Sequence, residues 1–270
     1  MEIQFSKMSG NGNDFIIIDN REGKFSSLYK NEFIEKICAR GLSVGADGVI
    51  FIEKSDKVDF KWQFYNSDGS VAEMCGNGAR CAARYAYLEN IAGKNMAFET
   101  LAGIIKAEIM DNNEVKTMLT PPHSLELDKK ITACGKEYDI HSINTGVPHA
   151  VIICDNVDNV DVHHIGRDIR YNKDFAVNGT NVNFIQVTGD NSLKIRTYER
   201  GVEGETLACG TGCAASAIIA INKGLVKGPV RLLTSGGKTL TVYYDNNTVY
   251  LQGEGRRVYI AKLQEEAYNY

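Results

Sequence analysis

The 270-residue sequence has no marked excess of charge of either sign and no long apolar run. Lys and Arg number 30 against 34 Asp and Glu, a net charge of −4, and no block of like charge stands out. Nucleic acids and membrane surfaces attract proteins through clustered positive charge, so this composition argues against both partners. The chain lacks an apolar run long enough for a membrane span and an apolar signal segment near Met1. We therefore expect a cytoplasmic protein.

The seven cysteines are an odd number without the spacing of a disulfide framework. This usage is typical of the reducing cytoplasm, where thiols stay free. Zinc sites favour closely spaced cysteine pairs with histidines nearby, which alanine-rich runs do not provide. We therefore expect no metal site. A cysteine outside a motif is most often a small buried residue, and this is expected of Cys38, Cys134, Cys154, Cys81 and Cys213.

Nucleotide-binding patterns are incomplete as well. The segment Gly210–Ala215 fits G-x-G-x-x-A, but no acidic residue follows at the required distance, near Thr234–Gly236. The complete glycine and lysine pattern of a phosphate-binding P-loop is also absent. We expect no cofactor.

One pattern occurs twice in the chain. Cys75–Arg84 and Cys209–Ala217 each place a cysteine and Gly-x-Gly at the start of an alanine-rich run that is typical of a helix. A strand pattern ending in tyrosine and a glycine-containing loop precede each copy. Because the copies lie about half the chain apart, they predict two similar domains.

We place the domain boundary at Thr120–His123, where two prolines interrupt a strand pattern. This divides the chain into residues 1–119 and 120–270, each with one of the repeated cysteines. The strand-like segment Val258–Ala261 is positioned to return to the sheet of the first domain.

The predicted fold class is α+β, with two pseudo-symmetric domains that each wrap a mixed sheet around one central helix. Helices are expected at residues 31–39, 76–89 and 210–223. Strands are expected at residues 14–19, 48–52, 60–65, 96–99, 103–109, 150–154, 182–187, 193–198, 230–233, 239–243 and 248–251.

A cysteine at a helix start has a chemical use. The positive end of the helix dipole and the free N–H groups there favour a thiolate, which predicts lowered thiol pKa values for Cys75 and Cys209. The following glycines let the same N–H groups approach an anion such as a carboxylate. Two such thiols on opposite faces of an α-carbon would remove one proton and deliver another, and so invert that carbon.

Five segments resemble the signature segments of the diaminopimelate epimerase family, in the same order and across nearly the whole chain. The resemblance implies cofactor-independent interconversion of LL- and meso-2,6-diaminopimelate for lysine and peptidoglycan precursors. It also implies two pseudo-symmetric domains closing over the small amino-acid substrate, and a homodimer. The segments are Met8–Phe15, Phe64–Ser70, Met74–Cys81, Tyr198–Gly201 and Glu205–Gly212.

The resemblance assigns roles to individual residues. Cys75 is expected to deprotonate the LL substrate and Cys209 the meso form, with His149 and Glu199 setting the protonation of the thiols. Arg200 suits the distal carboxylate, since a planar guanidinium binds both oxygens. The expected substrate-binding residues are Asn13, Asn66, Gly76, Asn77, Asn181, Glu199, Arg200, Gly210 and Thr211.

Two positions depart from the family pattern, both affecting the distal end of the substrate. Val147 stands where many members have asparagine before Pro-His, and Gly48 stands where members often have glutamine. Two alternatives stay open: a proline or hydroxyproline racemase of the same architecture, and a thiol redox protein that uses Cys75 and Cys209. Arg200 favours the diaminopimelate epimerase over the racemase, because diaminopimelate offers a second carboxylate and proline does not.

Overall fold

The computed structural model describes residues 2–175 and 178–270. The chain divides into two compact units, Met1–Thr117 with Gly253–Tyr270 (unit 1) and Met118–Gln252 (unit 2). No helix in the described part of the chain is both long and apolar enough to cross a membrane.

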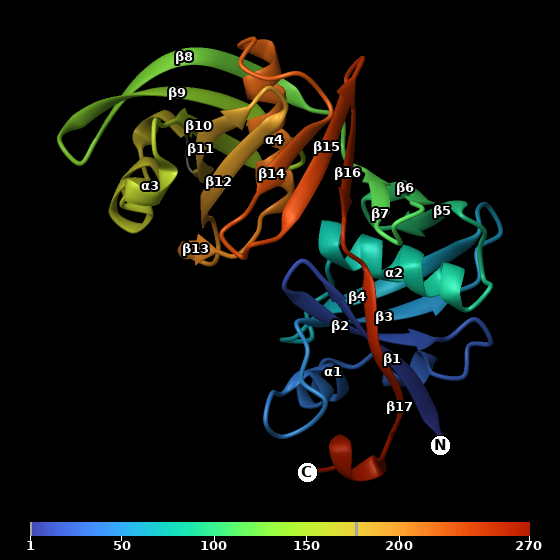
Figure 1. Cartoon of the computed structure of the whole chain (residues 1–270). Helices are drawn as coiled ribbons and strands as arrows, with labels where there is room; N and C mark the ends of the chain where they lie inside the picture. The colour runs from blue at the N-terminus through green and yellow to red at the C-terminus, as the bar shows by residue number, and fades with distance from the viewer. Residues whose placement is uncertain (1, 176–177) are drawn as a thin grey trace. The chain divides into compact units, whose positions relative to one another are not determined.

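The observed division into units differs from the expected one in the placement of the C-terminal strand. β17 (Arg256–Leu263) pairs antiparallel with β1 (Ile3–Gly10), with Ile3 opposite Leu263. Figure 1 shows the red C-terminal strand beside the blue N-terminal strand. The expected second domain of 120–270 is therefore too long at its C-terminal end, because the whole segment from Gly253 onward belongs to unit 1.

Unit 1 is a mixed sheet with one long and one short helix. Its strands are β1, β2 (Asn13–Asp19), β3 (Gly48–Glu53), β4 (Phe60–Asn66), β5 (Asn95–Thr100), β6 (Gly103–Ile109), β7 (Val115–Met118) and β17. Its helices are α1 (Asn31–Cys38) and α2 (Gly76–Leu88), with short 3-10 turns at Ser26–Leu28 and Glu265–Ala267.

Unit 2 has a similar set of elements, with β13 as an additional short strand. Its strands are β8 (His123–Ala133), β9 (Lys136–Asn144), β10 (Pro148–Ile153), β11 (Asn181–Gly189), β12 (Ser192–Glu199), β13 (Gly204–Thr206), β14 (Val230–Leu233), β15 (Thr239–Asp245) and β16 (Thr248–Gly253). Its helices are α3 (Val162–Arg170) and α4 (Gly210–Asn222), with 3-10 turns at Val157–Asn159 and Lys173–Phe175.

The two units repeat one strand topology. In unit 1, β2 runs parallel to β3 and β4 parallel to β5, and the remaining described pairings within the unit are antiparallel. In unit 2, β10 runs parallel to β11 and β12 parallel to β14, and the rest are again antiparallel. β17 takes in unit 1 the place that β8 takes in unit 2. The duplication seen in the sequence is therefore a duplication of the fold.

Each unit packs its sheet around the alanine-rich helix (Figure 1). In α4, every residue from Gly212 to Ala220 is buried. A helix that is apolar on all sides must be enclosed, and α4 contacts strands β9 to β12, β14 and β15. In α2, the small side chains of Ala79, Ala82 and Ala83 pack directly against the sheet of unit 1. Both helices are thus held rigidly, and so are the cysteines at their starts.

Sequence patterns missed the helix α3, the long hairpin of β8 and β9, and the strands β1 and β13. α3 buries Val162 and Ile169 and begins at Asp161, whose carboxylate accepts a hydrogen bond from the N–H of His164 at 3.2 Å. Its remaining face is polar, so its apolar signal is weak. β8 is mostly exposed and charged and has irregular register with β9, so it lacks the alternation that identifies a strand.

Candidate active site

The repeated cysteines occupy equivalent places in the two units. Cys75 and Cys209 have extended backbone conformations immediately before α2 and α4. The Sγ atom of Cys75 accepts a hydrogen bond from the N–H of Gly78 at 3.5 Å, in the manner of a helix-capping side chain. The Sγ atom of Cys209 lies 3.5 Å from the hydroxyl oxygen of Thr211. Each thiol therefore sits at the positive end of a helix.

The first turn of each helix contains backbone N–H groups that are not used by the helical hydrogen bonds. The first intrahelical bonds are those from the N–H of Ala79 to the carbonyl of Cys75 and from the N–H of Cys213 to the carbonyl of Cys209. The preceding N–H groups of each helix lack an acceptor in the helical ladder. Those of Gly76 and Asn77, and of Gly210 and Thr211, belong to these first turns, and the prediction that they bind a carboxylate stays a prediction.

The lowered pKa expected for Cys209 is wrong for this structure. The side chain is 8% exposed, and burial raises the pKa of the Cys209 thiol to about 12, with the carboxylate of Glu199 adding to the effect. Hydrogen bonds from Thr211 and from the N–H of Gly212 oppose this shift without cancelling it. The free-energy cost of desolvating the thiolate is larger here than the stabilisation that the helix N-terminus provides. Cys209 is therefore protonated at neutral pH.

His149 lies in the same cluster, at the start of β10. It is fully buried, its Nε2 atom is 3.0 Å from the hydroxyl oxygen of Thr211, and its Nδ1 atom is 3.1 Å from the amide nitrogen of Asn183. Burial, with a contribution from the positive charge of Arg200, lowers the pKa of His149 to about 3. The imidazole is therefore neutral at physiological pH and acts through hydrogen bonds.

The buried neutral histidine predicts a pH dependence of folding. Because the unfolded imidazole has a pKa of 6.5 and the folded one about 3, the unfolded chain binds the extra proton between these values. Stability is therefore lost as the pH falls through this window, by up to about 1.4 kcal/mol per pH unit from this group. Urea unfolding at about pH 7 and about pH 5 measures the slope. His149→Gln, which does not titrate, should lose less stability between the two; an equal loss would contradict the prediction.

Glu199 is the last residue of β12, and its carboxylate interacts electrostatically with the thiol of Cys209. One of its carboxylate oxygens accepts a hydrogen bond from the hydroxyl of Thr206 at 2.7 Å. Burial raises the pKa of Glu199, and its charge in turn raises the pKa of Cys209. The carboxylate thus favours the thiol over the thiolate at Cys209.

Asn181 and Arg200 are held together where β11 begins and β12 ends. The side-chain oxygen of Asn181 accepts the backbone N–H of Arg200 at 2.9 Å, and its nitrogen donates to the carbonyl of Pro148 at 3.0 Å. In this conformation Asn181 braces the loop after β12. The guanidinium of Arg200 donates to the carbonyl of Asn178 at 3.3 Å and pairs with no carboxylate in the described part of the chain. Its charge is therefore available to an anionic ligand.

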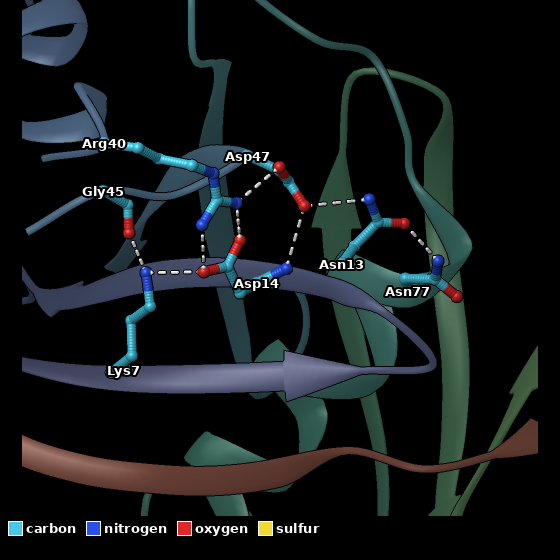
Figure 2. A network of polar contacts seen from close by, with 7 residues as sticks. All are labelled: Lys7, Asn13, Asp14, Arg40, Gly45, Asp47 and Asn77. Carbon is cyan, nitrogen blue, oxygen red and sulfur yellow. Dashed lines mark hydrogen bonds and ion pairs between the residues drawn. The ribbon is translucent and has the colours of Figure 1, made fainter. Parts of the chain in front are cut away.

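Unit 1 presents two asparagines next to Cys75. Figure 2 shows Asn13, at the start of β2, and Asn77, in the first turn of α2, pointing toward one another. The amide nitrogen of Asn77 donates to the side-chain oxygen of Asn13 at 2.5 Å, and the nitrogen of Asn13 donates to Asp47 at 3.0 Å. Both amides are therefore fixed in orientation.

A network of ion pairs contacts Asn13 through Asp47 (Figure 2). Asp47 accepts hydrogen bonds from Arg40 at 2.8 Å and from the N–H of Asp14 at 3.0 Å. Asp14 in turn pairs with Arg40 and with Lys7, whose ammonium lies 2.8 Å from it and also bonds the carbonyl of Gly45. Because a carboxylate only accepts, Asp47 dictates which end of the Asn13 amide faces it.

Arg80 supports the asparagines from the other side. It is fully buried, and its guanidinium donates to the side-chain oxygens of Asn77 and Asn11 and to the carbonyl of Glu254. A guanidinium only donates, so it fixes the opposite end of the Asn77 amide. Sequence reasoning missed both Arg80, which lies inside a repeated segment, and Asp47, because an isolated charged residue is normally solvated.

Asn66 and Gly48 face each other across β3 and β4. Asn66 is exposed and its side-chain nitrogen donates to the hydroxyl of Ser70 at 3.0 Å. A β-carbon added to Gly48 would lie 2.6 Å from the carbonyl oxygen of Tyr65 and 2.8 Å from the ring of Phe64. The glycine at position 48 is therefore required by packing in this chain, since no side chain fits there.

Two of the remaining cysteines differ in exposure from what was expected. Cys38, Cys81 and Cys213 are buried, in agreement with expectation, whereas Cys154 is half-buried and Cys134 is exposed. Cys134 lies in the tight turn between β8 and β9, where no element covers it.

The family model and the similar proteins match nearly the whole length of the chain. The family model described as diaminopimelate epimerase matches residues 5–125 and 141–258. Diaminopimelate epimerases of Aquifex aeolicus and Archaeoglobus fulgidus are 49% and 42% identical to the chain, covering 99% and 100% of it and the full length of each relative.

Among solved structures, a PhzF-family phenazine biosynthesis protein of Bacillus anthracis matches with a TM-score of 0.71 at 14% identity, covering 98% of this chain and 99% of that one. A probable proline racemase of Agrobacterium radiobacter K84 matches with a TM-score of 0.68 at 15% identity, covering 97% and 93%. At such low identity these two matches establish a shared fold only.

Proposed function

The chain belongs to the diaminopimelate epimerase family, and we propose that it interconverts LL- and meso-2,6-diaminopimelate by a two-base reaction at Cys75 and Cys209. The protein is an isomerase of the amino-acid epimerase class. The observation that carries the two-base proposal is the repeat itself. Each unit presents one thiol at the start of its central helix, beside backbone donors suited to a carboxylate.

The chemistry requires both features. An α-proton next to a carboxylate is a very weak acid, so its removal depends on donors that stabilise the negative charge developing on the carboxylate oxygens. The N–H groups of Gly76, Asn77, Gly210 and Thr211 are the proposed donors. One cysteine removes the α-proton as a thiolate while the other, as a thiol, protonates the opposite face.

The protonation of Cys209 supports one direction of this exchange. Burial and Glu199 keep it as a thiol, which is the form that delivers a proton when Cys75 deprotonates the LL substrate. In the reverse direction the roles exchange, and Cys209 must then exist as a thiolate. Stabilisation of that thiolate is therefore part of the reaction.

The remaining contacts are proposed from the resemblance to the family, and the surroundings of Arg200 support one of them. Arg200 is the proposed partner of the distal carboxylate, because its guanidinium is unpaired among the described carboxylates. Asn13, Asn66, Asn77, Asn181 and Glu199 are the proposed contacts to the rest of the substrate. Because Val147 carries no amide and no side chain fits at position 48, the distal end depends more heavily on Arg200 here.

The deciding experiment is incubation of the reduced protein with LL-diaminopimelate in D2O, without pyridoxal phosphate or added metal. We expect α-deuterated meso product, detected by NMR and chiral separation. Proline or hydroxyproline in a parallel reaction serves as the control for a racemase of the same fold. Exchange on the control substrates alone, or reduction of a disulfide substrate without exchange, would overturn the proposal.

We further expect a cytoplasmic homodimer. Sedimentation velocity of the purified protein measures the mass directly, and a monomeric mass would contradict this expectation.

A further inference from the structure

A directional chain of hydrogen bonds connects the interior of unit 2 to Cys209. It begins at Asn183, a fully buried residue of β11 that sequence patterns did not single out. The side-chain nitrogen of Asn183 lies 3.0 Å from the carbonyl oxygen of Ala150, and its side-chain oxygen accepts the hydroxyl of Thr197 at 3.0 Å. A carbonyl only accepts, so the orientation of the Asn183 amide is fixed.

This orientation determines the tautomer of His149. The second N–H of the Asn183 amide faces the Nδ1 atom of His149 at 3.1 Å, so Nδ1 must accept and carries no proton. A neutral imidazole then carries its proton on Nε2. Protonation of Nδ1 would place its N–H against the N–H of Asn183 in a buried site, which agrees with the low pKa of this side chain.

The Nε2–H tautomer of His149 in turn determines how the hydroxyl of Thr211 is oriented. The N–H at Nε2 of His149 donates to the Thr211 oxygen at 3.0 Å. Because that oxygen accepts from His149, the single proton of the hydroxyl is free to point elsewhere. The Sγ atom of Cys209 lies 3.5 Å from the same oxygen, within hydrogen-bonding range for sulfur.

We propose that the Thr211 hydroxyl is a dedicated donor to the Cys209 thiolate, and that His149 and Asn183 are positioning residues that fix its direction. The inference rests on the proposed acid and base role of Cys209 and extends it. Glu199, on β12, favours the thiol, whereas Thr211, on α4, favours the thiolate left after proton delivery. Glu199 and Thr211 thus stabilise opposite protonation states of the Cys209 sulfur, so that the sulfur can hold the proton and then release it.

The residue two positions after the equivalent thiol is different. In unit 1, the position of Thr211 in the repeat is taken by Asn77, whose amide nitrogen is engaged by Asn13. The N–H of Gly78 donates to the Sγ atom of Cys75. Cys75 therefore serves as an internal control in any variant of Thr211.

The test is the alkylation rate of each cysteine by iodoacetamide at about pH 8, resolved by peptide mass spectrometry. This rate follows the thiolate fraction. Thr211→Val keeps the shape and removes the hydroxyl, and we expect Cys209 to react about tenfold more slowly, since a hydrogen bond to a charged group contributes about 1.5 kcal/mol or more. Thr211→Ser should restore the rate to near that of the parent protein, while Cys75 reacts equally in all three. An unchanged Cys209 rate in Thr211→Val, or equal slowing of both cysteines, would overturn the proposal.

The tautomer is tested without any variant. ¹⁵N-labelled histidine in the intact protein should show His149 protonated on Nε2 alone from about pH 5 to pH 9, since Nδ1 accepts from Asn183. Assignment uses the missing signal in His149→Gln. A proton on Nδ1 would refute the chain of donors. Neither measurement requires turnover, so a protein that fails to epimerise diaminopimelate but shows both results would overturn only the proposed function.

Discussion

Replacement of either Cys75 or Cys209 by alanine is expected to abolish epimerisation. Each variant removes the only group proposed to transfer the proton on one face of the α-carbon, so neither direction of the reaction can be completed. Cys→Ser at either position should leave at most a trace, because a hydroxyl is a far weaker acid than a thiol and forms its anion at much higher pH. The measurement is the rate of meso product formation from the LL substrate under reducing conditions.

Cys134→Ala is the matched control for these variants. Cys134 is exposed in the β8–β9 turn and has no place in the proposed site, so its removal should leave the rate unchanged. Circular dichroism establishes that each variant folds. Full activity in Cys75→Ala or Cys209→Ala would disprove the two-base assignment.

Gly212→Ala is expected to be the most damaging substitution outside the cysteines. A β-carbon at this position would lie 2.4 Å from the side-chain oxygen of Asn183 and 3.3 Å from the Sγ atom of Cys209. Asn183 cannot yield easily, because Ala150 and Thr197 hold its amide. We expect destabilisation of about 1 to 3 kcal/mol from the overpacking. Displacement of the site should also lower kcat by about 100-fold.

Gly78→Ala supplies the comparison, since the same position in the other unit has room. A β-carbon there would lie 3.4 Å from the Cδ1 atom of Ile50 and 3.6 Å from the β-carbon of Cys75, which are ordinary contacts. Alanine is also the better helix former by about 1 kcal/mol. Thermal unfolding of the two variants should therefore shift in opposite directions. Equal shifts would show that Asn183 does not constrain Gly212.

Much of the architecture follows from local patterns. The expected helices at 76–89 and 210–223 agree with α2 and α4 to within a residue at their ends, because a glycine-rich start and an alanine run are local signals. Two of the missed elements, β8 and α3, have mainly polar side chains, whereas the missed strand β1 is mostly buried. Their burial depends on partners far along the chain, which periodicity does not reveal.

The candidate site divides in the same way. The sequence by itself determined the duplication, the two cysteines at helix starts and the asparagines and arginine in register with them, because each is encoded within a short segment. Only the tertiary structure decided that Cys209 is protonated, that Arg80 and Asp47 fix two asparagine amides, and that Asn183 and His149 orient Thr211. Those properties depend on burial and on contacts between residues distant in sequence, and desolvation of a thiolate or imidazolium in such surroundings outweighs the helix dipole that local sequence predicts.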